Sequence, residues 1–189
     1  MHRSLVLALC LACSPMPVCP SPSHLEAARA ATMILGDNCS AVVAGPDSLW
    51  TAGHCVGQAT VAAYRHRGDI ATRPARLVAD YPDRDLVRLR TDEMWLDTPA
   101  RRWPALGELA FVIHHRCPGG WCVAAAPVAY VGSLWNEAAL EWSPPPGASG
   151  SGVWGQDGAL LGIVQTRGTE TGRGYFATVA DLPTWNPDP

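Results

Sequence analysis

Three short segments of the chain carry residue types that could together perform nucleophilic chemistry. The segment 51–55 (TAGHC) places a histidine at the end of an apolar stretch, and the segment 146–152 (PGASGSG) places serines among glycines. Between these segments, Asp85 leads into an apolar run. A serine hydroxyl becomes an effective nucleophile when a base takes its proton, and a histidine base needs an acid to orient it. The sequence offers a candidate for each of these three roles.

The composition argues against nucleic-acid binding and against a serine–lysine dyad. The chain has 189 residues, of which 48% are hydrophobic, enough for one compact unit or two small lobes. Charged residues make up 16% and the net charge is −3, which gives no electrostatic reason to expect nucleic acid as a partner. All 14 basic residues are arginine, so a serine–lysine dyad is excluded by counting.

The N-terminus has the pattern of an export signal. A short positive region precedes an apolar core at residues 5–12, which is too short to span a bilayer. We therefore expect residues 1–20 to be a signal peptide and the protein to be secreted or periplasmic. Leu11-Ala12-Cys13 resembles a lipoprotein processing site, which leaves a lipid anchor at Cys13 as the alternative. The proline- and alanine-rich composition predicts a linker at residues 21–35.

The rest of the chain alternates short apolar runs with turn residues, and no long segment has a convincing helical period. We expect strands at residues 40–44, 49–51, 60–64, 76–78, 86–89, 109–114, 122–131, 139–142, 160–165 and 175–179. Residues 97–106, which contain two prolines, predict a connector. This regular spacing predicts an all-β protein of two antiparallel β-barrels.

The predicted domain covers residues 36–182, with an N-terminal barrel over about 36–96 and a C-terminal barrel over about 105–182. His54 and Asp85 fall in the first half and Ser149 falls in the second. A site assembled from all three would lie in the cleft between the barrels.

Together these motifs resemble the chymotrypsin-fold (trypsin-like) serine peptidases, of the small bacterial type. The resemblance covers residues 36–182 and rests on the motifs TAGHC at 51–55, DLV at 85–87, GASG at 147–150, LGIV at 161–164 and GYFATV at 174–179. The order histidine, aspartate, serine is specific, because unrelated serine hydrolase folds use other orders.

The resemblance implies a role for each residue. Ser149 would attack a carbonyl carbon, and His54 would take its proton and later return it to the leaving group. Asp85 would fix the imidazole tautomer, and the backbone N–H groups of Gly147 and Ser149 would form the oxyanion hole. The implied activity is that of a serine endopeptidase which forms an acyl-enzyme on protein or peptide substrates and needs no metal or cofactor.

Two of these assignments have competitors in the sequence. Asp80 and Asp83 compete with Asp85, which is favoured because an apolar pair follows it at once, as the family pattern requires. Ser151 competes with Ser149, which is favoured because it has a glycine two residues before it and another directly after it.

Four cysteines beyond the leader favour an oxidising compartment. Their spacing predicts the pairs Cys39–Cys55 and Cys117–Cys122, and in the family the first bond staples the strands that present the histidine. The alternative is a metal site that uses residues 114–115 (HH) beside Cys117. Turn residues between Cys117 and Cys122 favour the disulfide, and no Cys-x-x-Cys pair occurs beyond the leader, so we expect no metal.

One departure from the digestive-type pattern bears on activation. Activated members carry an aspartate directly before the serine, and it pairs with a new N-terminal amine. This chain has Ala148 there, so we expect no zymogen activation by that route. Gly152-Val153 also replaces the common Gly-Pro, as in other small bacterial members.

The resemblance assigns the substrate pocket to Ser143, Val164, Gln165, Thr166 and Gly174. None of these is acidic, so a preference for lysine or arginine lacks its usual anchor. We expect the pocket to accept small or uncharged side chains and the protein to be a monomer. The alternatives are a catalytically inactive binding protein of the same fold and an esterase that uses the same triad.

Overall fold

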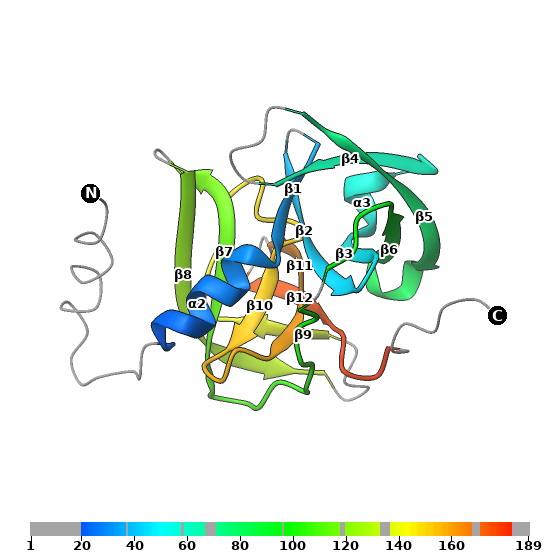
Figure 1. Ribbon diagram of the computed structural model, residues 1–189. Helices are drawn as coiled ribbons and strands as arrows, with labels where there is room; N and C mark the ends of the chain where they lie inside the picture. The colour runs from blue at the N-terminus through cyan, green and yellow to red at the C-terminus, as the bar shows by residue number, and fades with distance from the viewer. Residues whose placement is uncertain are drawn as a thin grey trace.

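Two closed antiparallel β-barrels lie side by side in the computed structural model (Figure 1). It describes residues 20–36, 38–57, 59–66, 71–95, 97–117, 120–132, 137–167 and 171–182, with the backbone alone at 116, 117, 120, 166 and 167. The predicted all-β class and the two-barrel architecture are therefore confirmed.

The first barrel is closed by pairing between its first and fourth strands. Its strands are β1 (Thr32–Leu35), β2 (Cys39–Gly45), β3 (Ser48–Ala52), β4 (Val61–Arg65), β5 (Arg73–Tyr81) and β6 (Leu86–Thr91), in the order β1-β2-β3-β6-β5-β4. Closure comes from the antiparallel pairs Ile34 with Arg65 and Leu35 with Tyr64. A single-turn helix, α3 (Gly53–Val56), follows β3, and a 3₁₀ turn, η1 (Pro82–Arg84), precedes β6.

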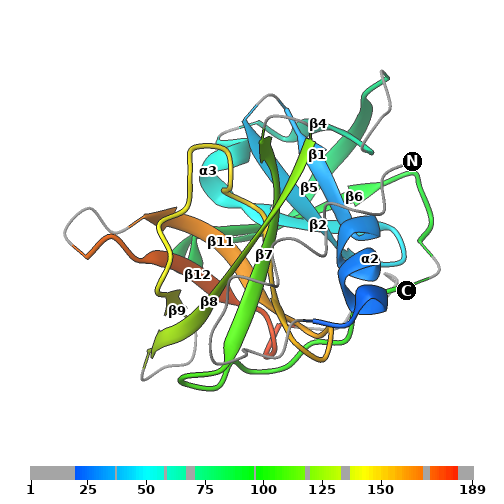
Figure 2. The same ribbon diagram turned by 90° about the vertical axis from the view of Figure 1, so that its left-hand side faces the viewer.

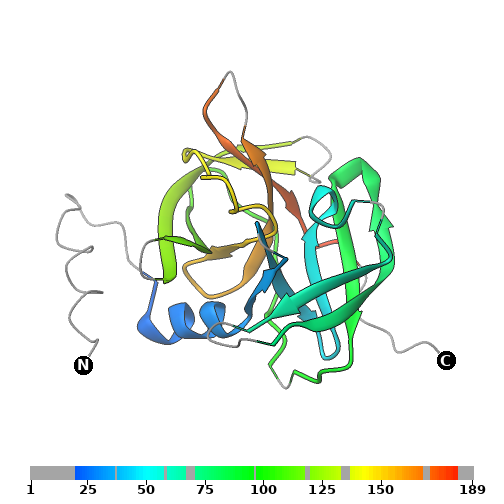
Figure 3. The same cartoon turned by 90° about the horizontal axis from the view of Figure 1, so that it is seen from above.

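The second barrel repeats this arrangement with the other half of the chain. Its strands are β7 (Leu109–Cys117), β8 (Gly120–Val131), β9 (Glu137–Leu140), β10 (Gly152–Gly155), β11 (Leu160–Arg167) and β12 (Gly174–Thr178), in the order β10-β11-β12-β9-β8-β7. The barrel is closed where β10 pairs with β7. Figure 3, which views the molecule from above, shows the two barrels next to each other.

Each of the ten predicted runs overlaps one of these strands. Sequence reasoning missed β1 and β10, and the prediction of a linker at residues 21–35 is wrong. Most of that segment is folded, because it forms helix α2 (Pro22–Ala30) and then β1. The first barrel therefore begins at Thr32 rather than near residue 36.

Helix α2 is held on the outside of the barrels by a cap and by packing (Figure 2). The Ser21 hydroxyl accepts a hydrogen bond from the His24 N–H at 3.2 Å, which satisfies one of the free N–H groups at the helix start. Leu25 and Ala28 are buried. His24 Nδ1 lies 2.8 Å from the Gln156 carbonyl oxygen in the second barrel, so α2 links that barrel to β1.

The barrels share one hydrophobic core. Buried side chains of the first barrel, among them Trp50 and Leu86, belong to the same cluster as Phe111 and Trp154 of the second. A separate cluster fills the second barrel and includes Ala148, which is fully buried. A close-packed core shared by both barrels resists their relative movement.

The leader predicted at residues 1–20 lies almost wholly outside the described residues, and so does Cys13. Across the described segments, no helix has the length and apolar character needed to cross a membrane.

The predicted disulfide between Cys39 and Cys55 is present and joins the start of β2 to α3. Cys122 is also disulfide-bonded. The side chain of Cys117 is not among those described, so its pairing with Cys122 stays a prediction.

We predict that the double variant Cys39→Ser/Cys55→Ser lowers the free energy of unfolding by about 3 kcal/mol, because the bridge closes a loop of 16 residues in the unfolded chain. Urea unfolding of the oxidised protein and of the variant measures this difference. A loss below about 1 kcal/mol would show that the bond restricts the unfolded chain far less than its loop length predicts.

Candidate active site

The pairing of β3 with β6 brings His54 and Asp85 together. Ala52 at the end of β3 pairs with Leu86 at the start of β6, so the residues just beyond both strands leave the same edge of the barrel. His54 Nδ1 lies 2.6 Å from Asp85 Oδ2, and the His54 backbone N–H donates to Asp85 Oδ1 at 2.8 Å. These two bonds fix the carboxylate and the imidazole relative to each other.

The backbone on both sides of this pair is specialised for close approach. Asp85 has φ 44° and ψ 49°, the left-handed conformation that lets the chain turn sharply from η1 into β6. A β-carbon on Gly53 would lie 2.9 Å from Asp85 Oδ1, so only glycine leaves room for the carboxylate at this position. Asp80 and Asp83, the competing acids, are exposed and have no described bond to His54.

Arg84 attaches the Asp85 loop to the second barrel. Its guanidinium makes a bidentate ion pair with Asp181, in which Nη1 donates to Oδ1 at 2.7 Å and Nη2 donates to Oδ2. Nη1 also lies 3.4 Å from the carbonyl oxygen of Thr178 at the end of β12. The hydrogen bond from Arg84 holds the pKa of Asp181 below its usual range.

Ser149 lies in a loop made of two consecutive β-turns. Ala148 N–H donates to the Pro145 carbonyl at 3.1 Å, and Ser151 N–H donates to the Ala148 carbonyl at 3.0 Å. The third residue of each turn is a glycine with positive φ, +88° at Gly147 and +79° at Gly150. Among the described residues, Asp85 is the only non-glycine with a positive φ, so the second residue of each turn, Pro146 or Ser149, has a negative φ. A negative φ at the second position followed by a positive φ at the third defines a type II turn.

Two backbone N–H groups of this loop remain available. Among the described residues, nothing accepts a hydrogen bond from the N–H of Gly147 or of Ser149, whereas the N–H groups of Ala148, Gly150 and Ser151 all have backbone acceptors. Available N–H groups on alternate residues can converge on one anionic oxygen. These are the two donors that the sequence predicted.

Gly150 joins the nucleophile loop to the first barrel. A β-carbon at this position would lie 1.9 Å from the Ser40 carbonyl oxygen and 2.4 Å from Thr51 Oγ1. The Ser40 N–H donates to the Ser149 carbonyl at 2.8 Å, which ties the two barrels together at the loop. The competing serine, Ser151, is fully buried, so its hydroxyl faces no solvent.

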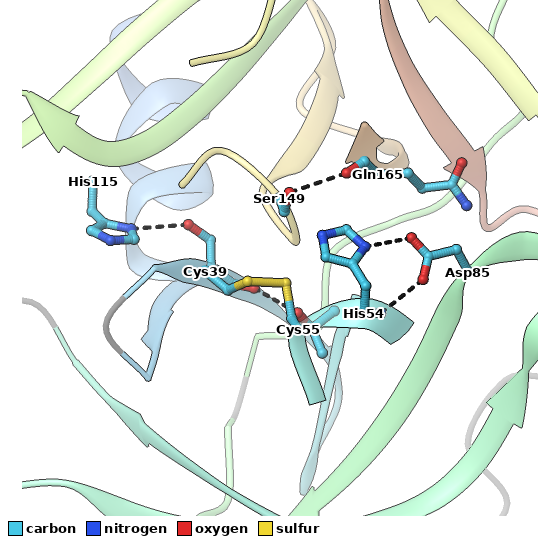
Figure 4. Close-up of a disulfide and its surroundings, with 9 residues drawn as sticks. Cys39, His54, Cys55, Asp85, His115, Ser149 and Gln165 are labelled. Carbon is cyan, nitrogen blue, oxygen red and sulfur yellow. Dashed lines mark hydrogen bonds and ion pairs between the residues drawn. A yellow bond between two sulfur atoms is a disulfide. The ribbon is translucent and has the colours of Figure 1, made fainter. Parts of the chain in front are cut away.

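Figure 4 shows the imidazole of His54 between the Asp85 carboxylate and Ser149. In this conformation the Ser149 hydroxyl donates to the Gln165 carbonyl oxygen at 3.0 Å. His54 and Ser149 line the same groove, and a serine side chain has three staggered positions for its hydroxyl.

The groove has a volume of about 260 Å³, and the residues that line it are His54, Pro144, Pro145, Pro146, Ser149, Val164 and Gln165. Of the predicted pocket, Val164 and Gln165 lie here. Ser143 is exposed and does not line the groove, and the side chain of Thr166 is not described. Gly174 is buried behind Pro144, whose Cδ would lie 2.9 Å from a β-carbon at 174.

Sequence reasoning missed the three prolines as groove residues. Their position could have identified them, because three consecutive residues without N–H groups directly precede the predicted oxyanion donor. The pocket assignment followed the resemblance and passed over them.

The two histidine side chains of the alternative metal site do not converge on one point. The neighbouring residues His114 and His115 face opposite sides of β7, as alternate strand residues must. His114 is buried, which lowers the pKa of its imidazole, whereas His115 Nδ1 lies 3.1 Å from the Ser40 hydroxyl. The donor atoms of Cys39, His54 and Cys55 lie within 4.8 Å of one another, but both sulfur atoms are in the disulfide.

A family model described as a trypsin-like peptidase domain matches residues 39–163. No curated protein matches the sequence.

Solved structures similar in fold include three bacterial proteases. The serine endoprotease of Yersinia pestis has a TM-score of 0.70 and 21% identity, over 82% of this chain and 61% of that one, so the chain spans less than two thirds of its length. The active form of the Rv3671c protease of M. tuberculosis has a TM-score of 0.71 and 16% identity, over 90% and 89%. The MamO protease domain of Magnetospirillum magneticum has 0.69 and 18%, over 84% and 96%. At these identities the likeness shows the fold alone.

We predict that Gly150→Ala lowers the free energy of unfolding by about 2–5 kcal/mol, the sum of left-handed backbone strain and overpacking against Ser40. Gly107→Ala is the matched control. Gly107 has φ +80° in a similar turn and no atom within 4 Å of its β-carbon position, so only the strain of about 1–2 kcal/mol applies. Urea unfolding measures both variants, and equal losses would show that the contact with Ser40 relaxes freely.

Proposed function

The chain belongs to the family of trypsin-like peptidases, and we propose that it is a serine endopeptidase with His54, Asp85 and Ser149 as its catalytic triad. The observation that carries this proposal is the double hydrogen bond between His54 and Asp85 beside a groove that Ser149 lines. An acid–base pair and a nucleophile in one groove suit acyl transfer.

The residues perform distinct steps in the proposed reaction. His54 takes the proton of Ser149 Oγ as the oxygen attacks the carbonyl carbon of the scissile peptide bond. The Gly147 and Ser149 N–H groups stabilise the negative oxygen of the tetrahedral intermediate. The proton on His54 then passes to the leaving amine, and an acyl-enzyme remains on Ser149. Water, deprotonated by the same imidazole, releases the acid and restores the serine.

The groove supports cleavage next to an uncharged side chain. Apart from His54, the described lining consists of prolines, Ser149, Val164 and the amide Gln165, so among these residues there is no counter-charge for a lysine or a glutamate. Placing an unpaired charge there would carry a desolvation penalty with no compensating ion pair. We therefore propose small or medium uncharged residues on the acyl side of the cleaved bond.

We also propose that the protein is exported and acts as a monomer on protein or peptide substrates. The Cys39–Cys55 disulfide supports an oxidising compartment. A lipid anchor at Cys13 remains the alternative to release.

One observation favours the competing proposal of an inactive binding protein: the Ser149 hydroxyl donates to Gln165 rather than to His54. A nucleophile held in that conformation would not react. Direct labelling of the serine distinguishes a resting conformation from a silent site, and comparison of peptide with simple ester substrates separates a peptidase from an esterase.

We predict that a fluorophosphonate probe labels the folded protein and that Ser149→Ala abolishes labelling and peptide hydrolysis. Ser151→Ala is the matched control, because its side chain is buried and takes no part in the proposed chemistry. A folded, soluble protein that the probe does not label would contradict the proposed function.

We further predict that Asp85→Asn lowers kcat by about 10⁴-fold, because the amide no longer holds the required imidazole tautomer. Asp83→Asn, an exposed acid of the same loop, should leave kcat within about twofold. Steady-state kinetics on a peptide substrate checks both, and a reversed order would show that Asp85 is the wrong carboxylate.

A further inference from the structure

The oxyanion loop begins with an uninterrupted run of prolines. Pro144, Pro145 and Pro146 line the groove and lead directly into Gly147. Their rings fix φ near −65° and remove three N–H donors, so the first N–H of the loop is that of Gly147. Ala148 carries no carboxylate, so an ion pair of the kind that orders this segment in activated family members cannot form here.

The type II turn decides the direction of the Gly147 N–H. Pro146 and Gly147 are its two central residues, and the turn is closed by the bond from Ala148 N–H to the Pro145 carbonyl. A type I turn closes with the same bond, but its central dihedrals differ by about 150° in ψ and about 170° in φ. The peptide group between Pro146 and Gly147 would then point the opposite way, and the direction of its N–H would reverse.

Sequence preferences all favour the type II turn that is observed. Proline at the second position excludes turns that need positive φ there, and glycine at the third position accepts the observed +88°. Pro146 also restricts Pro145 to extended backbone, and Pro145 restricts Pro144 in the same way. Pro144 is buried against Gly174, which anchors the start of the run in the second barrel.

We propose that Pro145 and Pro146 are positioning residues that hold the type II turn and thereby keep the Gly147 N–H directed at the substrate carbonyl. The inference rests on the proposed peptidase function. It assigns the order of the oxyanion hole to a rigid local segment, so the enzyme is competent as folded and needs no second event to orient the donor.

Kinetics and peptide geometry together test the proposal. Pro146→Ala and Pro145→Ala should each lower kcat about two- to fivefold with KM unchanged, the size expected when a proline constraint is released. The double variant should lose more than either single variant. Pro74→Ala, at an exposed site on β5, is the matched control for loss of a proline and should keep the wild-type kcat.

Substitutions at Gly147 separate an effect of backbone conformation from an effect of side-chain size. Gly147→Ala disfavours positive φ and should lower kcat about 10²- to 10³-fold, the effect of losing one oxyanion donor. Asparagine tolerates positive φ, so Gly147→Asn should retain intermediate activity although its side chain is larger. A purely steric effect would give the opposite order.

Nuclear Overhauser effects report the turn directly. A strong effect between the Pro146 Hα and the Gly147 N–H marks type II. A weak effect between these two protons, together with a strong effect between the Pro146 Hδ protons and the Gly147 N–H, marks type I. The wild type should show the first pattern, and Pro146→Ala should show a mixture. Wild-type kinetics in both proline variants, or a type I pattern in the wild type, would overturn the proposal. A wild type that neither hydrolyses peptides nor reacts with the fluorophosphonate would instead refute the proposed function, while the turn measurement still tests this inference.

Discussion

A backbone contact between the barrels sets the geometry of the candidate active site. Gly150 lies so close to the Ser40 carbonyl that no side chain fits between them, and Ser40 N–H binds the carbonyl of Ser149. His54 and Asp85 belong to the first barrel and Ser149 to the second, so the distance from nucleophile to base depends on how the barrels are joined. A glycine at this point permits a joint made of backbone, which varies far less than one made of flexible side chains.

The disulfide extends this joint to the histidine. Ser40 follows Cys39, Cys39 is bonded to Cys55, and Cys55 follows His54. Covalent bonds therefore lead from the imidazole to Ser40, and Figure 4 shows the disulfide between Cys39 and Cys55 beside His54. The disulfide restricts the position of His54 relative to Ser40 in the native state and also limits the unfolded chain. The stability of the fold and the alignment of the site thus share one structural element.

The sequence predicted the elements that local pattern controls and missed those that depend on distant contacts. The ten predicted strands have alternating or buried apolar runs, and the three triad candidates lie in short motifs with specific spacing. Strand β1 has four residues and gains its identity from pairing with β2 and β4. Helix α2 has nine residues, too few to be stable alone, and depends on burial of Leu25 and Ala28 and on the contact of His24 with Gln156. Its capping serine and its alanines were visible in the sequence, but the proline content pointed to a linker. The predicted pocket included Gly174 in error, because its covering by Pro144 is a contact between residues distant in the sequence and no local pattern indicates it.

The constraints on the two halves of the site differ in kind. The acid–base pair is fixed within one barrel, by the register of β3 with β6, by the left-handed backbone at Asp85 and by the space beside Gly53. The proposed nucleophile and the proposed oxyanion donors are held by turn conformation in the other barrel and by the contact at Gly150. A change in the core of the second barrel, such as at Ala148, would therefore move the nucleophile and leave the His54–Asp85 pair intact. Arg84 couples the two halves of the site in part, because its ion pair with Asp181 attaches the Asp85 loop to the chain just beyond β12. The site thus combines a pair that is rigid by itself with a nucleophile whose placement depends on how the two barrels pack.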